Sequence, residues 1–247
     1  MTTAKQHRGR PIPADYWDRV SVRYDRQLWL ESASVRCLLD LAAPTPHATV
    51  LDVATGTGAV LRILAARPSP PRQVVGVDRS QAMLERVPPL PDGWTTIRAD
   101  ARELPFADCT FDLVTASYLL HVLDDIDRAG VLNEAHRVLR HDGVIGVLTP
   151  AIPPRGPLRP VARALNQLAA RAPEHFAGLR ALDPSASLSK AGFEILRTRH
   201  TARGYIAMCT LAKRAQDGPN VGEESPNRCS LEAGAGSTSR RATRSLV

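Results

Sequence analysis

The chain has 247 residues, a length that allows one large domain or two small ones. Hydrophobic residues make up 43% and charged residues 23%, so the chain can bury a core and is not disordered throughout. The formal net charge of +7 permits an acidic partner. Aromatic residues are only 4%, however, which argues against an aromatic stacking platform for single-stranded nucleic acid.

The cysteine pattern and the hydropathy bear on the cellular compartment. The four cysteines contain no C-x-x-C pair, which argues against a zinc site and a disulfide framework and indicates thiols in a reducing cytosol. Residues 1–13 are basic without a following apolar run, so they are not expected to be a signal peptide. No apolar stretch reaches the roughly 18–20 residues of a membrane-spanning helix. We therefore expect a soluble, cytoplasmic protein without a bound metal.

Most of the chain reads as alternating strands and helices. After a flexible N-terminus (1–13), apolar residues at helical spacing predict a helix over 14–43, ended by Pro44. Strands are expected at 49–54, 73–78, 95–99, 111–116 and 143–148, and helices at 59–67, 80–86 and 127–140. This βαβ series predicts an α/β fold with a mainly parallel sheet and helices on both faces.

The order changes after residue 149. Helices are expected at 161–171 and 185–191, followed by two strands at 193–200 and 204–212 that a short turn connects. Residues 214–247 are rich in Gly, Ser, Arg and Asn and are expected to be a disordered tail. The prediction is one folded domain over 14–213.

The first strand leads into a glycine-containing turn, which reads DVATGTG over 52–58. Gly56 and Gly58 remove side chains that would keep a ligand away from backbone N–H groups. Asp78 follows Gly58 by twenty residues, at the end of the second strand, where a carboxylate can accept hydrogen bonds from ribose hydroxyls. Together these features predict an adenosine-type ligand at the carboxyl ends of parallel strands.

Two classes of ligand compete for this site. A dinucleotide is typical of G-x-G-x-x-G, but the run from Gly56 reads GTGAVL and lacks the third glycine. Asp52 lies inside the strand just before the turn, where a carboxylate suits a ligand with an amino group or a sulfonium. S-adenosylmethionine (SAM) carries both groups and is therefore the expected cofactor.

These stretches resemble the class I SAM-dependent methyltransferases, especially the branch that contains the ubiquinone/menaquinone C-methyltransferases. The similar segments are VLDVATGTG (50–58), VVGVDRSQAML (74–84), 97–123, EAHRVLRHDGVIGVL (134–148) and YWDRVSVRYDR (16–26). The last of these resembles an N-terminal helix that closes over SAM. The resemblance implies a Rossmann-like, doubly wound, seven-stranded and mostly parallel sheet, completed by an antiparallel C-terminal hairpin.

The resemblance also implies roles for individual residues. Asp52 would orient the methionine amino end, while Thr57 and the backbone of Gly56 and Gly58 would contact the methionine part. Asp78 would bind the ribose. Further cofactor-binding candidates lie at the adenine (Met83, Asp100 and Ala101) and at other positions of the matched segments (Tyr24, Ala54, Arg79 and Ser117).

The predicted reaction is methyl transfer to an O, N or C atom of a small organic acceptor. The displacement has a neutral leaving group, so proximity and orientation can supply much of the catalysis. A general base is needed only if the acceptor must lose a proton, and His121, just past the fourth strand, is the candidate. The alternatives are an NAD(P)-binding Rossmann oxidoreductase and a non-catalytic, methyltransferase-like scaffold.

The identity of the acceptor is less constrained. The segment Leu120-His121-Val122 departs from the quinone enzymes and argues against a quinone. The chain lacks the N/D-P-P-aromatic run and the Pro-Cys pair of nucleic-acid methyltransferases, so nucleic acid is not expected as a partner. The segment 150–182 is expected to form part of the acceptor pocket.

Overall fold

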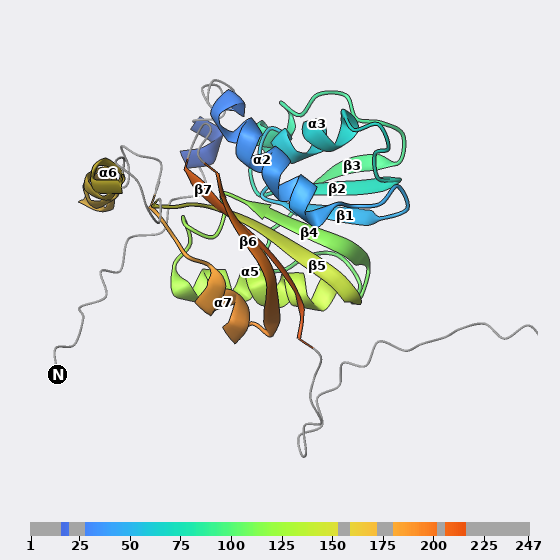
Figure 1. Cartoon of the computed structure of the whole chain (residues 1–247). Helices are drawn as coiled ribbons and strands as arrows, with labels where there is room; N and C mark the ends of the chain where they lie inside the picture. The colour runs from blue at the N-terminus through green and yellow to red at the C-terminus, as the bar shows by residue number, and fades with distance from the viewer. Residues whose placement is uncertain (1–15, 20–27, 153–158, 172–179, 202–205, 216–247) are drawn as a thin grey trace, which may run out of the picture. The chain divides into compact units, whose positions relative to one another are not determined.

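The structure, a computed structural model, describes residues 16–19, 28–152, 159–171, 180–201 and 206–215 (Figure 1). All of them fall in one unit of the chain, Met1–Asp217. The expected flexible N-terminus lies outside the described residues, as does nearly all of the expected tail. Arg214, the first residue of that predicted tail, instead ends the last strand.

A single seven-stranded sheet forms the centre of the described fold (Figure 1). Its strands are β1 (Thr49–Val53), β2 (Gln73–Asp78), β3 (Trp94–Arg98), β4 (Phe111–Ser117), β5 (Leu139–Pro150), β6 (Phe193–Thr201) and β7 (Ala207–Arg214). Their order across the sheet is β3-β2-β1-β4-β5-β7-β6, with β1 to β5 parallel and β7 antiparallel to both of its neighbours. The predicted fold class is confirmed, including the C-terminal antiparallel strands.

The helices follow the sequence prediction with small changes in their ends. They are α2 (Leu28–Ala42), α3 (Ala59–Ala65), α4 (Gln81–Leu84), α5 (Asp125–Val138), α6 (Arg159–Arg171) and α7 (Ser185–Lys190), and residues 16–19 are also helical. The predicted helix over 127–140 was wrong at both ends. Asp124 caps α5 by accepting a hydrogen bond from the Asp127 N–H, and β5 already begins at Leu139, which pairs with Phe111 of β4.

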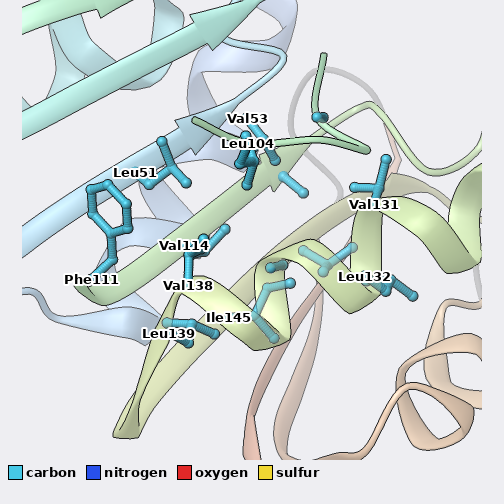
Figure 2. Close-up of a cluster of buried hydrophobic side chains, with 14 of the residues drawn as sticks. Leu51, Val53, Leu104, Phe111, Val114, Val131, Leu132, Val138, Leu139 and Ile145 are labelled. Atoms are coloured by element: carbon cyan, nitrogen blue, oxygen red, sulfur yellow. The ribbon is translucent and has the colours of Figure 1, made fainter. Parts of the chain in front are cut away.

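Helices cover both faces of the sheet, so the core has two parts. On one face, α5 and α7 pack on residues such as Leu51, Val114 and Ile145 (Figures 1 and 2). On the other face, α2 and α3 pack on a second set that includes Val50 and Leu113. Burying one such side chain contributes about 1.5–3 kcal/mol to the stability of the fold. The two layers therefore fix the strands, and with them the loops that begin at the strand ends.

The cysteines only partly follow the sequence prediction. Cys37 and Cys209 are free thiols. Cys109 is disulfide-bonded, so the expectation of reduced thiols is wrong at that position. None of the described helices combines the length and the apolar character needed to cross a bilayer.

Candidate functional site

A cleft opens at the carboxyl ends of the parallel strands. Its walls come from residue 17, from the segments that follow β1 to β4, and from the start of α5. The lining residues are Trp17, Ala54, Gly56, Asp78, Arg79, Met83, Ala99, Asp100, Ala101, Arg102, Ser117, Tyr118, Leu119, Val122, Leu123, Asp127 and Val131. This is the edge at which ligands bind in open α/β sheets.

The cleft brings together most of the residues predicted from the sequence. Predicted positions that line it are Ala54, Gly56, Asp78, Arg79, Met83, Asp100, Ala101 and Ser117. Four predicted positions are buried and are not among the lining residues: Asp52, Thr57, Gly58 and His121. Tyr24 lies outside the described residues.

The turn after β1 has an unusual backbone. Ala54, Gly56 and Gly58 have φ angles of 55°, 55° and 83°, in the left-handed region. The Thr55 N–H extends the strand pairing by donating to the carbonyl of Val77 at 2.9 Å. Ala54 adopts a conformation that costs a non-glycine residue about 1–2 kcal/mol, so the surrounding packing must enforce this turn. The result is that half-buried Ala54 and Gly56 form part of the cleft wall.

Asp78 is held by the same turn. Its Oδ2 accepts a hydrogen bond from the Gly56 N–H at 2.8 Å, and its Oδ1 accepts one from the Ser80 N–H at 2.9 Å. Burial raises the pKa of Asp78, while these backbone N–H donors and Arg79 oppose the shift. A carboxylate has about four acceptor sites, so Asp78 can still accept a hydrogen bond from a ligand in the cleft.

Asp52 is completely enclosed beneath the turn. Its Oδ1 accepts a hydrogen bond from the Thr115 hydroxyl at 2.6 Å, and its Oδ2 is buried with no hydrogen-bond partner. Burial raises the pKa of Asp52 to about 7, against the opposing effect of the Thr115 hydrogen bond. The nearby Thr55 hydroxyl also opposes the shift, so it is the nearest further donor for this carboxyl.

An apolar slot with a carboxylate lies at the far end of the cleft. Met83, Ala99 and Ala101 supply the apolar surface, and Ser80 fixes Met83 by accepting its backbone N–H at 3.1 Å. Asp100 supplies the carboxylate, and Arg102 holds it through three hydrogen bonds of 2.7–3.0 Å. The slot suits a flat base that carries an amino group.

The segment after β4 carries Tyr118 in a left-handed conformation, with φ 54°. Such strain in a bulky residue is typical of functional sites. The Tyr118 ring meets the His121 ring edge to face, at a centroid distance of 6.2 Å. His121 is buried, its Nδ1 has no hydrogen-bond partner, and burial together with Arg180 and Arg128 lowers its pKa to about 3. His121 is therefore neutral near pH 7.

Sequence reasoning missed several residues of the site. Arg102 and Asp127 line the cleft. Arg128 is buried and fixes the segment behind the cleft by donating to the carbonyls of Leu120 and Leu123, at 2.9 and 2.8 Å. No pattern in the sequence marks Arg128, because arginine is mostly exposed by type and its burial here is decided by tertiary packing.

The position of the missing third glycine separates the two ligand classes. It is occupied by Leu61, which is fully buried in the core on the α2 and α3 face. A Cβ on Gly76 would lie 3.2 Å from the Leu61 Cδ2, so the helix packs on β2 through this leucine. The dinucleotide fingerprint is thus absent in space as well as in sequence. Asp78, Asp100 and the turn fit an adenosine derivative.

Comparisons with known proteins agree with this geometry. Residues 50–143 match a family model described as a methyltransferase domain. A demethylmenaquinone methyltransferase of Thermotoga maritima is 34% identical over 138 residues, which cover 53% of this chain and 58% of the relative. The nocamycin O-methyltransferase of Saccharothrix syringae is 34% identical over 157 residues, which cover 59% of this chain and 53% of the relative. The chain thus spans little more than half the length of these relatives.

A solved structure shows the same fold. The TehB-like SAM-dependent methyltransferase of Corynebacterium glutamicum superposes with a TM-score of 0.56. The superposition covers 79% of this chain and 98% of that one, at 16% sequence identity. At this identity the likeness speaks for the fold alone.

Proposed function

We propose, from the membership of residues 50–143 in the methyltransferase domain family, that this protein transfers a methyl group from SAM to a small organic acceptor. The observation that carries the proposal is the cleft at the carboxyl ends of β1 to β4, where Gly56 and Asp78 are joined by a hydrogen bond. A third-glycine position occupied by a buried leucine disfavours an NAD(P)-dependent oxidoreductase.

The cleft residues would hold SAM by complementary chemistry. Asp78 would accept hydrogen bonds from the ribose, and Asp100 would accept one from the amino group of the adenine. Arg79 and Ser117 also line the cleft. The predicted contact between Asp52 and the methionine amino group stays a prediction, as do the predicted roles of Thr57, Gly58 and Tyr24.

Catalysis would rest mainly on positioning. Bound SAM supplies a methyl group on a sulfonium, which leaves as a neutral thioether. The chain contributes a rigid cleft that holds two reactants in one orientation, the effect that gives intramolecular reactions their large advantage.

His121 remains the predicted base for an acceptor that must lose a proton. It is neutral near pH 7 and can accept a proton, but its low pKa makes it a weak base. Its edge-to-face contact with Tyr118 suggests a second role, which is to support the strained residue at the cleft wall.

The names of two relatives support a small organic acceptor. One relative is named for demethylmenaquinone and the other for O-methylation of nocamycin, so both are named for small organic molecules. We propose an acceptor of this size, with 150–182 forming part of its pocket. Nucleic acid is not expected as a partner, and the cytoplasmic location stays a prediction.

Titration calorimetry with SAM, S-adenosylhomocysteine and NADH tests the cofactor. We expect micromolar binding of the first two, and at least about tenfold weaker binding by Asp78→Asn, since a hydrogen bond to a charged group is lost. Arg140→Gln is a suitable control, because Arg140 pairs with Asp112 on the opposite edge of the sheet. Binding of NADH in place of SAM would support the oxidoreductase.

Transfer of a labelled methyl group from SAM to a metabolite extract tests the activity. We expect label in one or a few small molecules. Tight SAM binding with no labelled product would favour the non-catalytic scaffold.

A further inference from the structure

We infer that Arg102 is a positioning residue for the base end of the cleft. By bridging Asp100 and Asp127, it holds the Asp100 carboxylate in place to accept a hydrogen bond from an amino group on the ligand's base. This inference rests on the proposed function, because it takes the ligand to be an adenosine derivative.

Arg102 fixes the Asp100 carboxylate with three donors. Its backbone N–H and its Nε donate to Asp100 Oδ1 at 2.9 and 3.0 Å, and its Nη2 donates to Oδ2 at 2.7 Å. The Glu103 N–H donates to the Asp100 carbonyl at 3.0 Å, which closes the turn around the same residue. Oδ1 therefore has both of its lone pairs engaged, while Oδ2 keeps one for a ligand.

The other end of the bridge lies on α5. Nη1 of Arg102 donates to Asp127 Oδ1 at 2.7 Å, and the Asp127 N–H is fixed in turn by the Asp124 cap. The stem of Arg102 lies over Gly130, where an added Cβ would be 3.6 Å from the Arg102 Cβ and Cγ. The loop after β3 is thus tied to the first turns of a helix that packs on the core. All three bridge residues line the cleft.

The bridge also sets the charge of the carboxylate. The hydrogen bonds from Arg102 lower the pKa of Asp100, and its positive charge adds to the effect. An ionised carboxylate has only acceptors, so it selects a ligand that presents a donor at that point. A 6-amino purine meets this demand, whereas a 6-oxo purine presents an acceptor and is rejected.

The exposure of these side chains indicates that their ion pairs add little to the stability of the fold, so a role in ligand binding can be measured apart from a role in stability. Arg102, Asp100 and Asp127 are 41%, 33% and 23% exposed, so solvent screens their attraction. Arg140 and Asp112 form a comparable pair at 43% and 36% exposure, but they lie away from the cleft. Removing either arginine should change stability by a similar small amount, and only one removal should change ligand binding.

The experiment measures binding of two ligands to four proteins by calorimetry. The ligands are S-adenosylhomocysteine and its analogue with the 6-amino group replaced by oxygen. The proteins are the full-length wild type, Arg102→Gln, Arg102→Lys and the control Arg140→Gln. Thermal melting without ligand reports on folding.

We expect Arg102→Gln to weaken binding of S-adenosylhomocysteine about tenfold or more, while the 6-oxo analogue changes little. The preference for the amino base therefore falls. Arg102→Lys keeps the positive charge but cannot bridge Asp100 and Asp127, so its affinity for S-adenosylhomocysteine should lie between those of the wild type and Arg102→Gln. Arg140→Gln should bind both ligands as the wild type does.

Three results would overturn the inference. The first is unchanged binding by Arg102→Gln, the second is an equal loss for both ligands, and the third is a loss matched by Arg140→Gln. If the wild type binds neither ligand, the proposed function fails instead. If Asp127→Asn weakens binding of S-adenosylhomocysteine when introduced alone, but not when combined with Arg102→Gln, then Asp127 acts through Arg102.

Discussion

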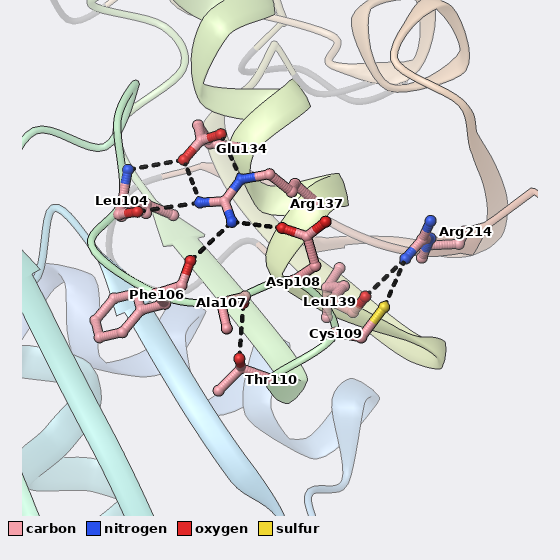
Figure 3. A network of polar contacts seen from close by, with 10 residues as sticks. All are labelled: Leu104, Phe106, Ala107, Asp108, Cys109, Thr110, Glu134, Arg137, Leu139 and Arg214. Atoms are coloured by element: carbon pink, nitrogen blue, oxygen red, sulfur yellow. Dashed lines mark hydrogen bonds and ion pairs between the residues drawn. The ribbon is translucent and has the colours of Figure 1, made fainter. Parts of the chain in front are cut away.

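Replacing Arg137 by Gln removes the side chain that ties the loop between β3 and β4 to α5 (Figure 3). Its Nη1 donates to the carbonyl of Phe106 at 2.7 Å and to Asp108 Oδ1 at 2.8 Å. Its Nη2 donates to the carbonyl of Leu104 at 3.0 Å and to Glu134 Oε2 at 2.8 Å, and its Nε donates to Glu134 Oε1 at 2.8 Å. All five N–H groups of the guanidinium are therefore used.

The loss of free energy of unfolding can be worked from these contacts. The two part-buried carbonyls lose a charged donor, at about 1–1.5 kcal/mol each after allowance for partial exposure. The ion pair with Glu134, with side chains 26% and 19% exposed, adds at most about 1 kcal/mol. We therefore expect Arg137→Gln to destabilise the fold by about 2–4 kcal/mol, because hydrogen bonds to carbonyls and not ion pairing dominate.

Urea denaturation followed by circular dichroism measures this difference, with Arg140→Gln as the matched control. That control breaks a single exposed pair and should cost less than about 1 kcal/mol. Arg137→Lys should recover little, since an ammonium cannot serve these acceptors in a fork. Equal losses for Arg137→Gln and Arg140→Gln, or full recovery by lysine, would refute the reasoning.

Three further predictions concern the site itself. Burial raises the pKa of Asp52 from 3.8 to about 7, so the folded chain binds that proton more tightly. Wild type should therefore lose stability relative to Asp52→Asn as the pH rises through about 4–7, and a difference that does not vary with pH would contradict this. Gly58→Ala should cost about 1–3 kcal/mol in urea denaturation, because the φ of 83° disfavours a side chain and its Cβ would lie 3.1 Å from Val87 Cγ1. His121→Ala should lower turnover at least about tenfold at unchanged SAM affinity if His121 is the base, and unchanged turnover would remove it from the mechanism.

The part of the site that the sequence predicted lies at the carboxyl ends of single strands. The glycines over 56–58, the carboxylate of Asp78 and the Asp100-Ala101 pair each follow directly from one expected strand. Because the carboxyl ends of parallel strands meet at one edge of the sheet, predicting the strands was enough to bring these residues together. The same reasoning placed His121 beside the acceptor, whereas in the structure it is buried and is not among the residues that line the cleft.

The sequence by itself determined the order of the strands and helices, and it predicted an adenosine-type ligand at the carboxyl ends of the parallel strands. Hydrophobic periodicity and turn chemistry carry this information within a few neighbouring residues. Only the tertiary structure decided which side chains close the cleft. Arg102 finds Asp127 across 25 residues, and Asp18 binds Ser80 across 62. Such partners depend on how helices pack on the sheet, and no local pattern of residues encodes that distance or direction.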